Sequence, residues 1–311
     1  MSIRKIAEMT GVSKSSVSRV INNDKYVSDD KRKLVQNAIK QMNYVINGNA
    51  VNLSKGKTNT IGITLPYNHP CYENLVNHLL FHAKKYDYQV MILPTYYEEN
   101  TEERYYSMLE KKLIDALILT SRSNIELNWQ RLNSVGKVIS TEKLINDDIS
   151  MIYSDRKFAY EELFKNLYDE NYSNILFTVK RNQQHSQSTR DKVSCFEKYF
   201  GKAVEGKNYF VGLDSYAQGL ELGLKLECLP EVIYANGDET AAGIISGLQQ
   251  QGFVHNQDYK IIGEGNLSFS QLLGFSTIDF RSDEIAKKVI EFILSDNLLI
   301  KEKIKPQVIY Y

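Results

Sequence analysis

The stretch VSKSSVSRVINND, residues 12–24, places four serines among three valines close to the N-terminus. Its later valines and its isoleucine recur at helical spacing, so we expect a helix from Lys14 to Asn22 that turns one face to a small core. Ser13 stands where a hydroxyl caps the first turn of such a helix. The serines and the two basic side chains then face away from the core, where they can contact a partner.

Two further helices are predicted on either side of this stretch. IRKIAEMT, residues 3–10, forms the first behind Ser2 as a cap, and Gly11 ends it in a tight turn that needs positive φ or close approach. Ser28 caps the third helix, which runs to about Met42. Two short helices joined by a glycine-containing turn and closed by a third are typical of a helix-turn-helix domain. The predicted core positions of the first and third helices are Ile3, Ile6, Ala7, Met9, Leu34, Val35, Ala38, Ile39 and Met42.

The charges are distributed unevenly along the chain, although the net charge is zero. Residues 1–58 contain 11 Lys and Arg against four Asp and Glu, whereas the other 253 residues contain 27 against 34. A basic head on an acidic body indicates that the head meets a polyanion. Short polar side chains let a helix lie deep in the major groove, where Arg19 can contact guanine and contribute about 1–3 kcal/mol of base discrimination. A solvated helix in an unrelated three-helix domain explains the pattern equally well at this point.

Residues 3–53 resemble the N-terminal headpiece of the lactose/galactose repressor (LacI/GalR) family nearly position for position. The matching runs are IAEMTGVSKSSVSRVIN, VSDDKRKLVQNAIKQMNY and NGNAVNL. The resemblance implies that the second helix reads the major groove, with Lys14 and Ser15 at the variable base-reading positions and Arg19 as a further base contact. It also implies backbone-positioning contacts to DNA from Ser13, Ser16, Ser18, Asn22 and Tyr26.

Residues 47–55, NGNAVNLSK, match the hinge helix of the same family. The resemblance implies that Leu53 enters the minor groove at the operator centre, with the small Ala50 beside it and Asn47 also at the DNA. Such an insertion unstacks and kinks the base step. Gly48 and the asparagines weaken the helix on its own, which favours folding upon DNA binding. A plain flexible linker in the free protein is compatible with the same residues.

From residue 59 onward, short apolar runs alternate with helical patterns. Repeated β-α units of this kind predict doubly wound parallel sheets, and two series predict two similar lobes with a ligand cleft between them. The predicted strands are TIGITLP, YQVMILP, IDALILT, KVISTE and MIYSD, followed by NILFTV, NYFVGL, EVIYAN, YKIIGEG and FSTIDF. The predicted amphipathic helices between them include 71–86, 156–171, 214–226 and 238–252.

This body resembles the periplasmic-binding-protein-like core of the same repressor family. The predicted fold class is therefore a small all-α helix-turn-helix headpiece plus an α/β core of two doubly wound parallel-sheet lobes. The predicted boundaries are 1–46 for the headpiece, 47–58 for the hinge or linker, 59–156 and about 281–296 for the first lobe, and 157–280 and about 297–311 for the second.

The resemblance also implies effector-binding residues in the cleft. TIGITLPYNHPCYENL places Asn68 and Tyr72 near it. SQSTRDKVSCFEKYF resembles a segment whose arginine grips effector hydroxyls or a carboxylate; Lys192 takes that place by register, and Arg190 is the alternative. Lysine is a poorer bidentate partner than arginine, which leaves the effector class open. Asp214 stands where the family can supply a ligand-stacking residue, and it favours a polar contact.

Further along the chain, the cleft motifs depart from the family pattern. IYANGDETAAG has one residue more than the matching motif, so either Asn236 or Asp238 can supply the effector-binding acid. Asp238 is equally suited to cap the helix that follows. Glu264–Asn266 replaces a run of the type GyDD, and Phe280 stands where a glutamine or aspartate is common. The effector is therefore expected to be unusual, or absent.

No metal, cofactor or catalytic activity is predicted. His78 and His82 are spaced as metal ligands can be, but without the glutamate of HExxH they are expected to be partly exposed beside a core stripe of Leu79, Leu80 and Ala83. The three cysteines are far apart and odd in number, which argues against a disulfide framework. No P-loop or GxSxG run occurs in the sequence.

Taken together, these patterns predict a transcription regulator, expected to act as a repressor, that binds a palindromic operator in double-stranded DNA as a homodimer. A small molecule, a sugar or sugar phosphate, would control it from the cleft. The absence of a signal peptide and of long apolar runs predicts a cytoplasmic bacterial protein without a membrane partner, associated with the nucleoid when DNA-bound. The alternative is a ligand-binding receptor of the periplasmic type without a gene-regulatory role, which the headpiece counts against.

Overall fold

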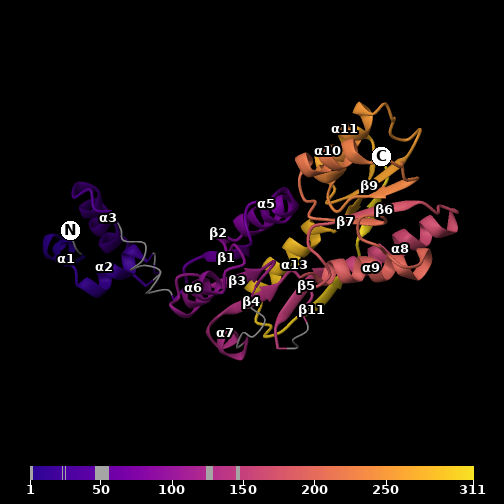
Figure 1. The fold of residues 1–311 in the computed structure, drawn as a ribbon. Helices are drawn as coiled ribbons and strands as arrows, with labels where there is room; N and C mark the ends of the chain where they lie inside the picture. The colour runs from indigo at the N-terminus through magenta and orange to yellow at the C-terminus, as the bar shows by residue number, and fades with distance from the viewer. Residues whose placement is uncertain (1–2, 23, 25, 46–55, 124–128, 145–147) are drawn as a thin grey trace.

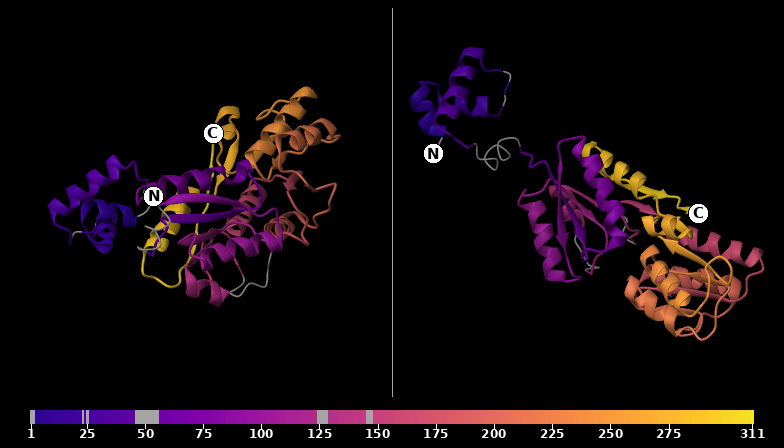
Figure 2. Two further views of the ribbon diagram at one scale, coloured as in Figure 1. Left: turned by 90° about the vertical axis from the view of Figure 1, so that its left-hand side faces the viewer. Right: turned by 90° about the horizontal axis from the view of Figure 1, so that it is seen from above.

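The computed structural model describes residues 3–22, 24, 26–45, 56–123, 129–144 and 148–311. The chain forms a three-helix headpiece and two α/β lobes, and the headpiece lies apart from both lobes (Figure 1 and the right-hand view of Figure 2). The predicted cap Ser2 and the predicted hinge residues Asn47, Ala50 and Leu53 lie outside the described residues.

The headpiece consists of α1 (Ile3–Thr10), α2 (Lys14–Ile21) and α3 (Asp29–Gln41). Gly11 has a φ of +66° in the turn between the first two helices, as predicted. Ser13 is the N-cap of α2, and its hydroxyl oxygen accepts a hydrogen bond of 3.2 Å from the amide of Ser16. Ser28 occupies the N-cap position of α3 without a side-chain hydrogen bond to the helix.

The headpiece core is smaller than the sequence predicted. Its buried members include Ile6, Val17 and Val35, together with two residues between the helices, Val12 and Val27. The predicted core positions Met9 and Leu34 are instead 55% and 48% exposed. A domain of three short helices has too little interior to cover every apolar side chain on its helices.

The first lobe is a six-stranded parallel sheet covered by helices on both faces. Its strand order is β11-β5-β4-β3-β1-β2. The strands are β1 (Thr60–Leu65), β2 (Gln89–Pro94), β3 (Ala116–Leu119), β4 (Lys137–Ser140), β5 (Ser150–Ser154) and β11 (Lys301–Ile304). The helices are α5 (Pro70–Lys84), α6 (Glu99–Glu110), α7 (Trp129–Val135) and α13 (Ser282–Leu294). Helices α5 and α13 pack side by side on one face, and α6 and α7 supply the core of the other (Figure 1).

The second lobe repeats this plan with strand order β12-β10-β9-β8-β6-β7. The strands are β6 (Ile175–Val179), β7 (Tyr209–Val211), β8 (Val232–Tyr234), β9 (Lys260–Glu264), β10 (Ser276–Asp279) and β12 (Gln307–Ile309), of which β12 is antiparallel to β10. The helices are α8 (Arg156–Asp169), α9 (Gln187–Phe200), α10 (Tyr216–Lys225), α11 (Asp238–Gln250) and α12 (Ser268–Leu273). Each of the ten predicted strands overlaps one of β1 to β10.

The last two strands divide between the lobes, which corrects one predicted boundary. The prediction places residues from about 297 to 311 in the second lobe, but 301–304 pair in parallel with β5 of the first lobe. Only β12 joins the second sheet. KEKI carries no apolar alternation that would mark it as a strand, and it forms because the edge of β5 offers unpaired backbone groups.

Helices α10 and α11 pack with their backbones in contact. Gly219 and Gly223 of α10 face Gly243 and Gly247 of α11. A Cβ atom at Gly243 would lie 2.1 Å from the carbonyl oxygen of Tyr216 in the partner helix. These glycines are therefore required by the approach of two helices rather than by a turn.

The two histidines of α5 lie against the start of α13. His82 Nε2 is 2.8 Å from Asp283 Oδ1, and His78 Nδ1 is 3.0 Å from Ser282 Oγ. The prediction was wrong for His82, which is buried, and for Leu80, which is 44% exposed. His78 is partly exposed, and Leu79 and Ala83 are buried, as predicted. The packing of α13 on α5 determines which face of α5 is buried.

Metal-binding clusters and membrane-spanning helices are both missing from the described residues. No group of three or more His, Cys, Asp or Glu in this part of the chain is arranged to hold a metal ion. No helix in it combines the length and the apolar character needed to cross a membrane.

Candidate nucleic-acid interface and ligand cavity

Helix α2 presents a polar face to solvent because its apolar face is anchored in the headpiece core. Val17 and Val20 are buried, whereas Lys14, Ser15 and Arg19 are exposed. The Arg19 side chain is 59% exposed, and its Nε lies 4.0 Å from Asp24 Oδ2. An ion pair this long and this exposed contributes little, so the guanidinium can exchange it for a base or phosphate.

Three hydroxyls gather at the first turn of α2. Ser13 Oγ donates a hydrogen bond of 2.9 Å to Ser16 Oγ and lies 3.0 Å from Ser15 Oγ. The unpaired amides of a first helical turn and the positive end of the helix dipole favour an anion such as a phosphate. The cap that forms α2 therefore also places donors where a DNA backbone can use them.

The remaining predicted DNA contacts follow the end of α2. The backbone N–H of Asn22 donates a hydrogen bond of 2.9 Å to the carbonyl of Ser18. The side-chain oxygen of Asn22 is buried without a hydrogen-bond partner. Tyr26 is 91% exposed and is positioned by a hydrogen bond of 3.0 Å from its amide to Asp24 Oδ1. Ser16 and Ser18 are partly exposed.

A cavity of about 620 Å³ lies between the two lobes. The residues that follow β1, β3, β4 and β5 of one lobe and β6, β8 and β9 of the other line it. Ligands of open α/β sheets bind at these carboxyl ends of strands, and the volume is that of a small-molecule site.

Five of the seven predicted effector-binding residues line this cavity. They are Tyr72, Lys192, Asp214, Asn236 and Asp238. The other two, Asn68 and Arg190, are exposed and are not among the lining residues. Arg190 turns back on its own segment, where its guanidinium donates to Gln187 Oε1 at 2.9 Å and to the carbonyl of Gln183 at 2.5 Å. Of the two residues predicted for the arginine's role, only Lys192 faces the cleft side of α9.

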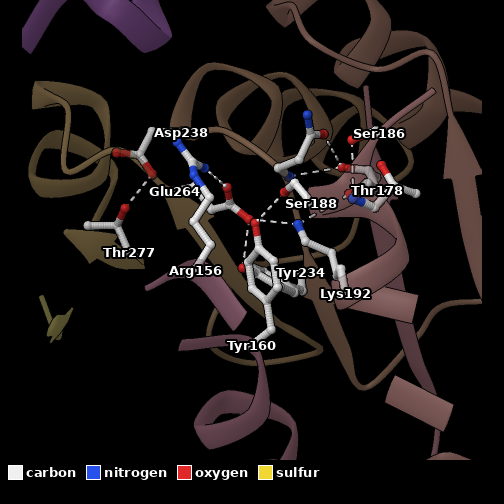
Figure 3. A network of polar contacts seen from close by, with 12 residues as sticks. Arg156, Tyr160, Thr178, Ser186, Ser188, Lys192, Tyr234, Asp238, Glu264 and Thr277 are labelled. Carbon is white, nitrogen blue, oxygen red and sulfur yellow. Dashed lines mark hydrogen bonds and ion pairs between the residues drawn. The ribbon is translucent and has the colours of Figure 1, made fainter. Parts of the chain in front are cut away.

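A network of charged and phenolic groups forms the floor of the cavity (Figure 3). Lys192 Nζ lies 2.6 Å from Glu264 Oε1, and the Tyr234 hydroxyl donates to the same oxygen at 2.6 Å. Lys192 Nζ also lies 4.0 Å from the centroid of the Tyr234 ring, and Lys192 is only 2% exposed. Burial lowers the pKa of Lys192, and the carboxylate of Glu264 opposes that shift.

Arg156 completes the network at the first residue of α8. Its Nη1 lies 3.6 Å from Glu264 Oε2, its guanidinium carbon lies 4.0 Å from the centroid of the Phe280 ring, and its side chain is 45% exposed. Tyr160 on the same helix is hydrogen-bonded to Ser188 Oγ at 2.8 Å, and burial raises the pKa of its hydroxyl. Arg156 was not among the predicted residues, although it lies two residues beyond the end of β5, where residues that follow a strand can face a ligand.

Asn236 and Asp238 both serve the structure of the second lobe. Asn236 Oδ1 accepts a hydrogen bond of 2.7 Å from Thr178 Oγ1. The fully buried Asp238 accepts bonds of 2.6 Å from Thr277 Oγ1 and from the amide of Leu267. Burial raises the pKa of Asp238 to about 6. The N-cap of α11 is Gly237, so the alternative prediction that Asp238 caps this helix was wrong.

Asp214 bridges the two lobes at the mouth of the cavity. Its carboxylate lies 2.8 Å from Lys180 Nζ and accepts a hydrogen bond of 3.3 Å from the hydroxyl of Tyr67 in the first lobe. Its carbonyl oxygen is 2.7 Å from His69 Nε2, also from the first lobe. The side chains on both sides of Asn68 are thus engaged in contacts between the lobes.

Two family profiles match the chain. The profile for bacterial regulatory proteins of the lacI family matches residues 2–47. The profile for periplasmic binding proteins and the sugar binding domain of the LacI family matches residues 58–293. These two matches coincide with the headpiece and with the two-lobed core.

Known relatives match along nearly the whole chain. Catabolite control protein B of Bacillus subtilis (strain 168) is 37% identical, over 97% of this chain and 98% of that protein. The NTD biosynthesis operon regulator NtdR of the same organism is 28% identical over 97% and 96% of the two chains. The HTH-type transcriptional repressor PurR of Actinobacillus pleuropneumoniae serotype 3 (strain JL03) is 27% identical over 99% and 95%.

Solved structures confirm the predicted fold class. A LacI-family transcriptional regulator from Silicibacter pomeroyi has a TM-score of 0.81 at 20% identity and covers 100% of this chain and 98% of its own. The lac repressor dimer bound to operator and the anti-inducer ONPF has a TM-score of 0.80 at 17% identity, over 99% and 97% of the two chains. With the profile matches and the relative at 37% identity, these findings establish that the chain belongs to the LacI family of bacterial regulatory proteins.

Proposed function

We propose that this protein is a DNA-binding transcriptional repressor whose affinity for its operator is controlled by a small molecule in the inter-lobe cavity. The observation that carries the proposal is the polar face of α2, which exposes Lys14, Ser15 and Arg19 on a headpiece that matches the regulatory family. It acts on the chromosome, and we infer that it associates with the nucleoid while bound to DNA.

We also propose that the protein is a homodimer on an inverted repeat. Apolar side chains exposed on both lobes support this assignment. In the first lobe, Phe81 of α5 and Met91 and Ile92 of the edge strand β2 are 59%, 40% and 49% exposed. In the second lobe, Leu224 of α10 and Leu272 of α12 are 44% and 81% exposed. A two-fold dimer would cover such faces and present two copies of α2 to two half-sites.

The proposed effector is a carbohydrate. Support comes from the composition of the cavity walls, which combine the aromatic rings of Tyr72, Tyr153 and Phe280 with the hydroxyls of Ser154 and Ser188. Rings can stack on the apolar faces of a sugar, and hydroxyls can exchange hydrogen bonds with it. A ligand that binds one relative orientation of the lobes better than another shifts the population of DNA-competent dimers.

Selection of binding sites from a random DNA library, followed by fluorescence anisotropy on the selected site, tests the proposal. We expect an inverted repeat, and we expect Arg19→Ala to cost about 1–3 kcal/mol of binding free energy on that site, with a smaller change on random DNA. Arg4→Ala is the matched control, because it removes the same charge from the exposed surface of α1, where Arg4 pairs with Glu8. Selection that returns no preferred sequence, or equal losses in both variants, would contradict the proposal.

A further inference from the structure

The buried Lys192 at the floor of the inter-lobe cavity already has a counter-ion within the protein, the carboxylate of Glu264. We propose that Glu264 forms an ion pair with the ammonium group of Lys192 and thereby makes the cavity selective for an uncharged polyhydroxylated effector. Phosphorylated or carboxylated counterparts of that effector would bind less tightly. This inference rests on the proposed function, because it specifies the chemistry of the ligand that controls DNA binding.

The first argument is that the ammonium group of Lys192 has no free side from which it could bind a ligand. Its Nζ is bound to Glu264 Oε1 at 2.6 Å and lies 3.5 Å from the carbonyl of Thr178. The face of the Tyr234 ring, 4.0 Å away, covers a further side. An anionic ligand could reach this ammonium only by displacing a carboxylate that is itself buried and held by two donors.

The second argument is that other cations of the cavity are also neutralised. Lys180 pairs with Asp214 at 2.8 Å, and Lys303 pairs with Asp155 at 2.9 Å. Nine Asp and Glu line the cavity against seven Lys and Arg. An incoming phosphate or carboxylate therefore meets no excess of positive charge that would attract it.

The third argument is that the groups left available suit a neutral ligand. Arg156 is 45% exposed, and its guanidinium carbon lies 4.0 Å from the centroid of the Phe280 ring, so its N–H groups can donate to a hydroxyl, while Glu142, which also lines the cavity, supplies negative charge beside it. The hydroxyls of Tyr160 and Ser188 lie beside it at the cavity wall. Buried sites that offer paired charges and hydroxyls bind ligands through hydrogen bonds rather than through net charge.

The test compares matched pairs of neutral and anionic probes by isothermal titration calorimetry with the full-length protein. The pairs are glucose with glucose 6-phosphate, ribose with ribose 5-phosphate, and galactose with galacturonate. We expect the wild-type protein to bind no anionic member more tightly than its neutral partner. Glu264→Gln frees Lys192, and we expect it to shift the ratio of the two affinities toward the anionic member by about tenfold or more, the value of one added charged hydrogen bond.

Two further variants show whether the shift has the proposed cause. Lys192→Met/Glu264→Gln removes both charges and should show no gain for the anionic probes. Glu264→Asp keeps a carboxylate near Lys192 and should retain the preference for neutral probes. If circular dichroism shows that Glu264→Gln does not fold, the ratio of the wild-type affinities for the neutral and the anionic probe tests the proposal by itself.

The result that would overturn the proposal is a wild-type protein that prefers the anionic member of any pair. A folded Glu264→Gln variant that gains no anionic binding would also overturn it. Operator binding is measured on the same preparations without any sugar, so that the two proposals fail separately. Loss of sequence-specific DNA binding would contradict the regulatory function, whereas intact DNA binding with an anionic preference would contradict the charge selectivity alone.

Discussion

The headpiece and the cavity floor use charged side chains in opposite ways. On α2, Lys14 and Arg19 are exposed, and the acid closest to Arg19 is 4.0 Å away. In the cavity floor, Lys192 and Glu264 are buried and bound to each other at 2.6 Å. A surface that binds DNA keeps its donors accessible, whereas a buried charge without a partner costs several kcal/mol. The accessibility of Lys14 and Arg19 follows from the helix that carries them, whereas the accessibility of Lys192 depends on a partner from a distant segment.

The largest effect is expected from a substitution that breaks the buried pair of Lys192 and Glu264. Lys192→Met leaves the Glu264 carboxylate buried with the Tyr234 hydroxyl and with Arg156 at 3.6 Å. We expect the free energy of unfolding of the core to fall by about 3–5 kcal/mol, because the buried carboxylate loses the cation that lies closest to it. Urea unfolding followed by circular dichroism measures the loss.

The double variant Lys192→Met/Glu264→Gln is the control for this prediction. It removes both charges, so its loss of stability should be clearly smaller than that of the single variant. Equal losses would mean that the pair matters through packing rather than through charge, and the contrast with the headpiece would disappear.

A second, smaller effect concerns pH. The folded-state pKa of Asp238 is raised by burial to about 6, above its ordinary value of 3.8, so the folded protein binds a proton more tightly than the unfolded chain. The stability contributed by this proton is present at low pH and is lost as the pH rises toward and past 6. Between pH 7 and pH 5 the free energy of unfolding of the wild type should gain about 1.4 kcal/mol relative to Asp238→Asn.

Thermal and urea unfolding of both proteins across this pH range measure the difference. Because other groups titrate in both chains, the quantity that matters is the difference between the wild type and the variant at each pH. A difference that is constant from pH 5 to pH 7 would show that Asp238 stays ionised when buried.

The smallest expected effect concerns the headpiece alone. Ser13→Ala removes the hydroxyl that caps α2 and should destabilise this helix by about 1 kcal/mol. Ser28→Ala is the matched control, because Ser28 holds the same position on α3 without a side-chain bond. Hydrogen exchange of the α2 amides in the full chain should accelerate in the first variant only, with no change at the cavity floor. Faster exchange in both regions would show that the headpiece and the core are coupled.

The agreement between sequence and structure is closest where the signal is local. Ser13, Gly11 and the buried valines of α2 all lie within a few residues of the helix that they determine. The alternating apolar runs likewise predict the ten strands, because a strand in a doubly wound sheet is buried on both faces and reads as a short apolar run.

The disagreements arise where a distant segment supplies the partner. Asn68 was predicted near the ligand, but Tyr67 and His69 on either side of it contact Asp214, which leaves Asn68 exposed. Arg190 lies two residues before Lys192 on α9, about half a helical turn away, so it does not face the cleft and bonds to its own segment instead. KEKI becomes a strand only because β5 lies beside it.

By itself, the sequence determined the three-helix headpiece, the polar face of α2, the alternation of strands and helices, and the family to which these patterns point. Each depends on a periodicity or a cap that spans a few consecutive residues. Tertiary structure alone decided that Lys192 meets Glu264, 72 positions further along the chain, and that the glycines of α10 and α11 lie in backbone contact. Whether a charge is available to a ligand depends on its neighbours in space, and those are set only when the chain has folded.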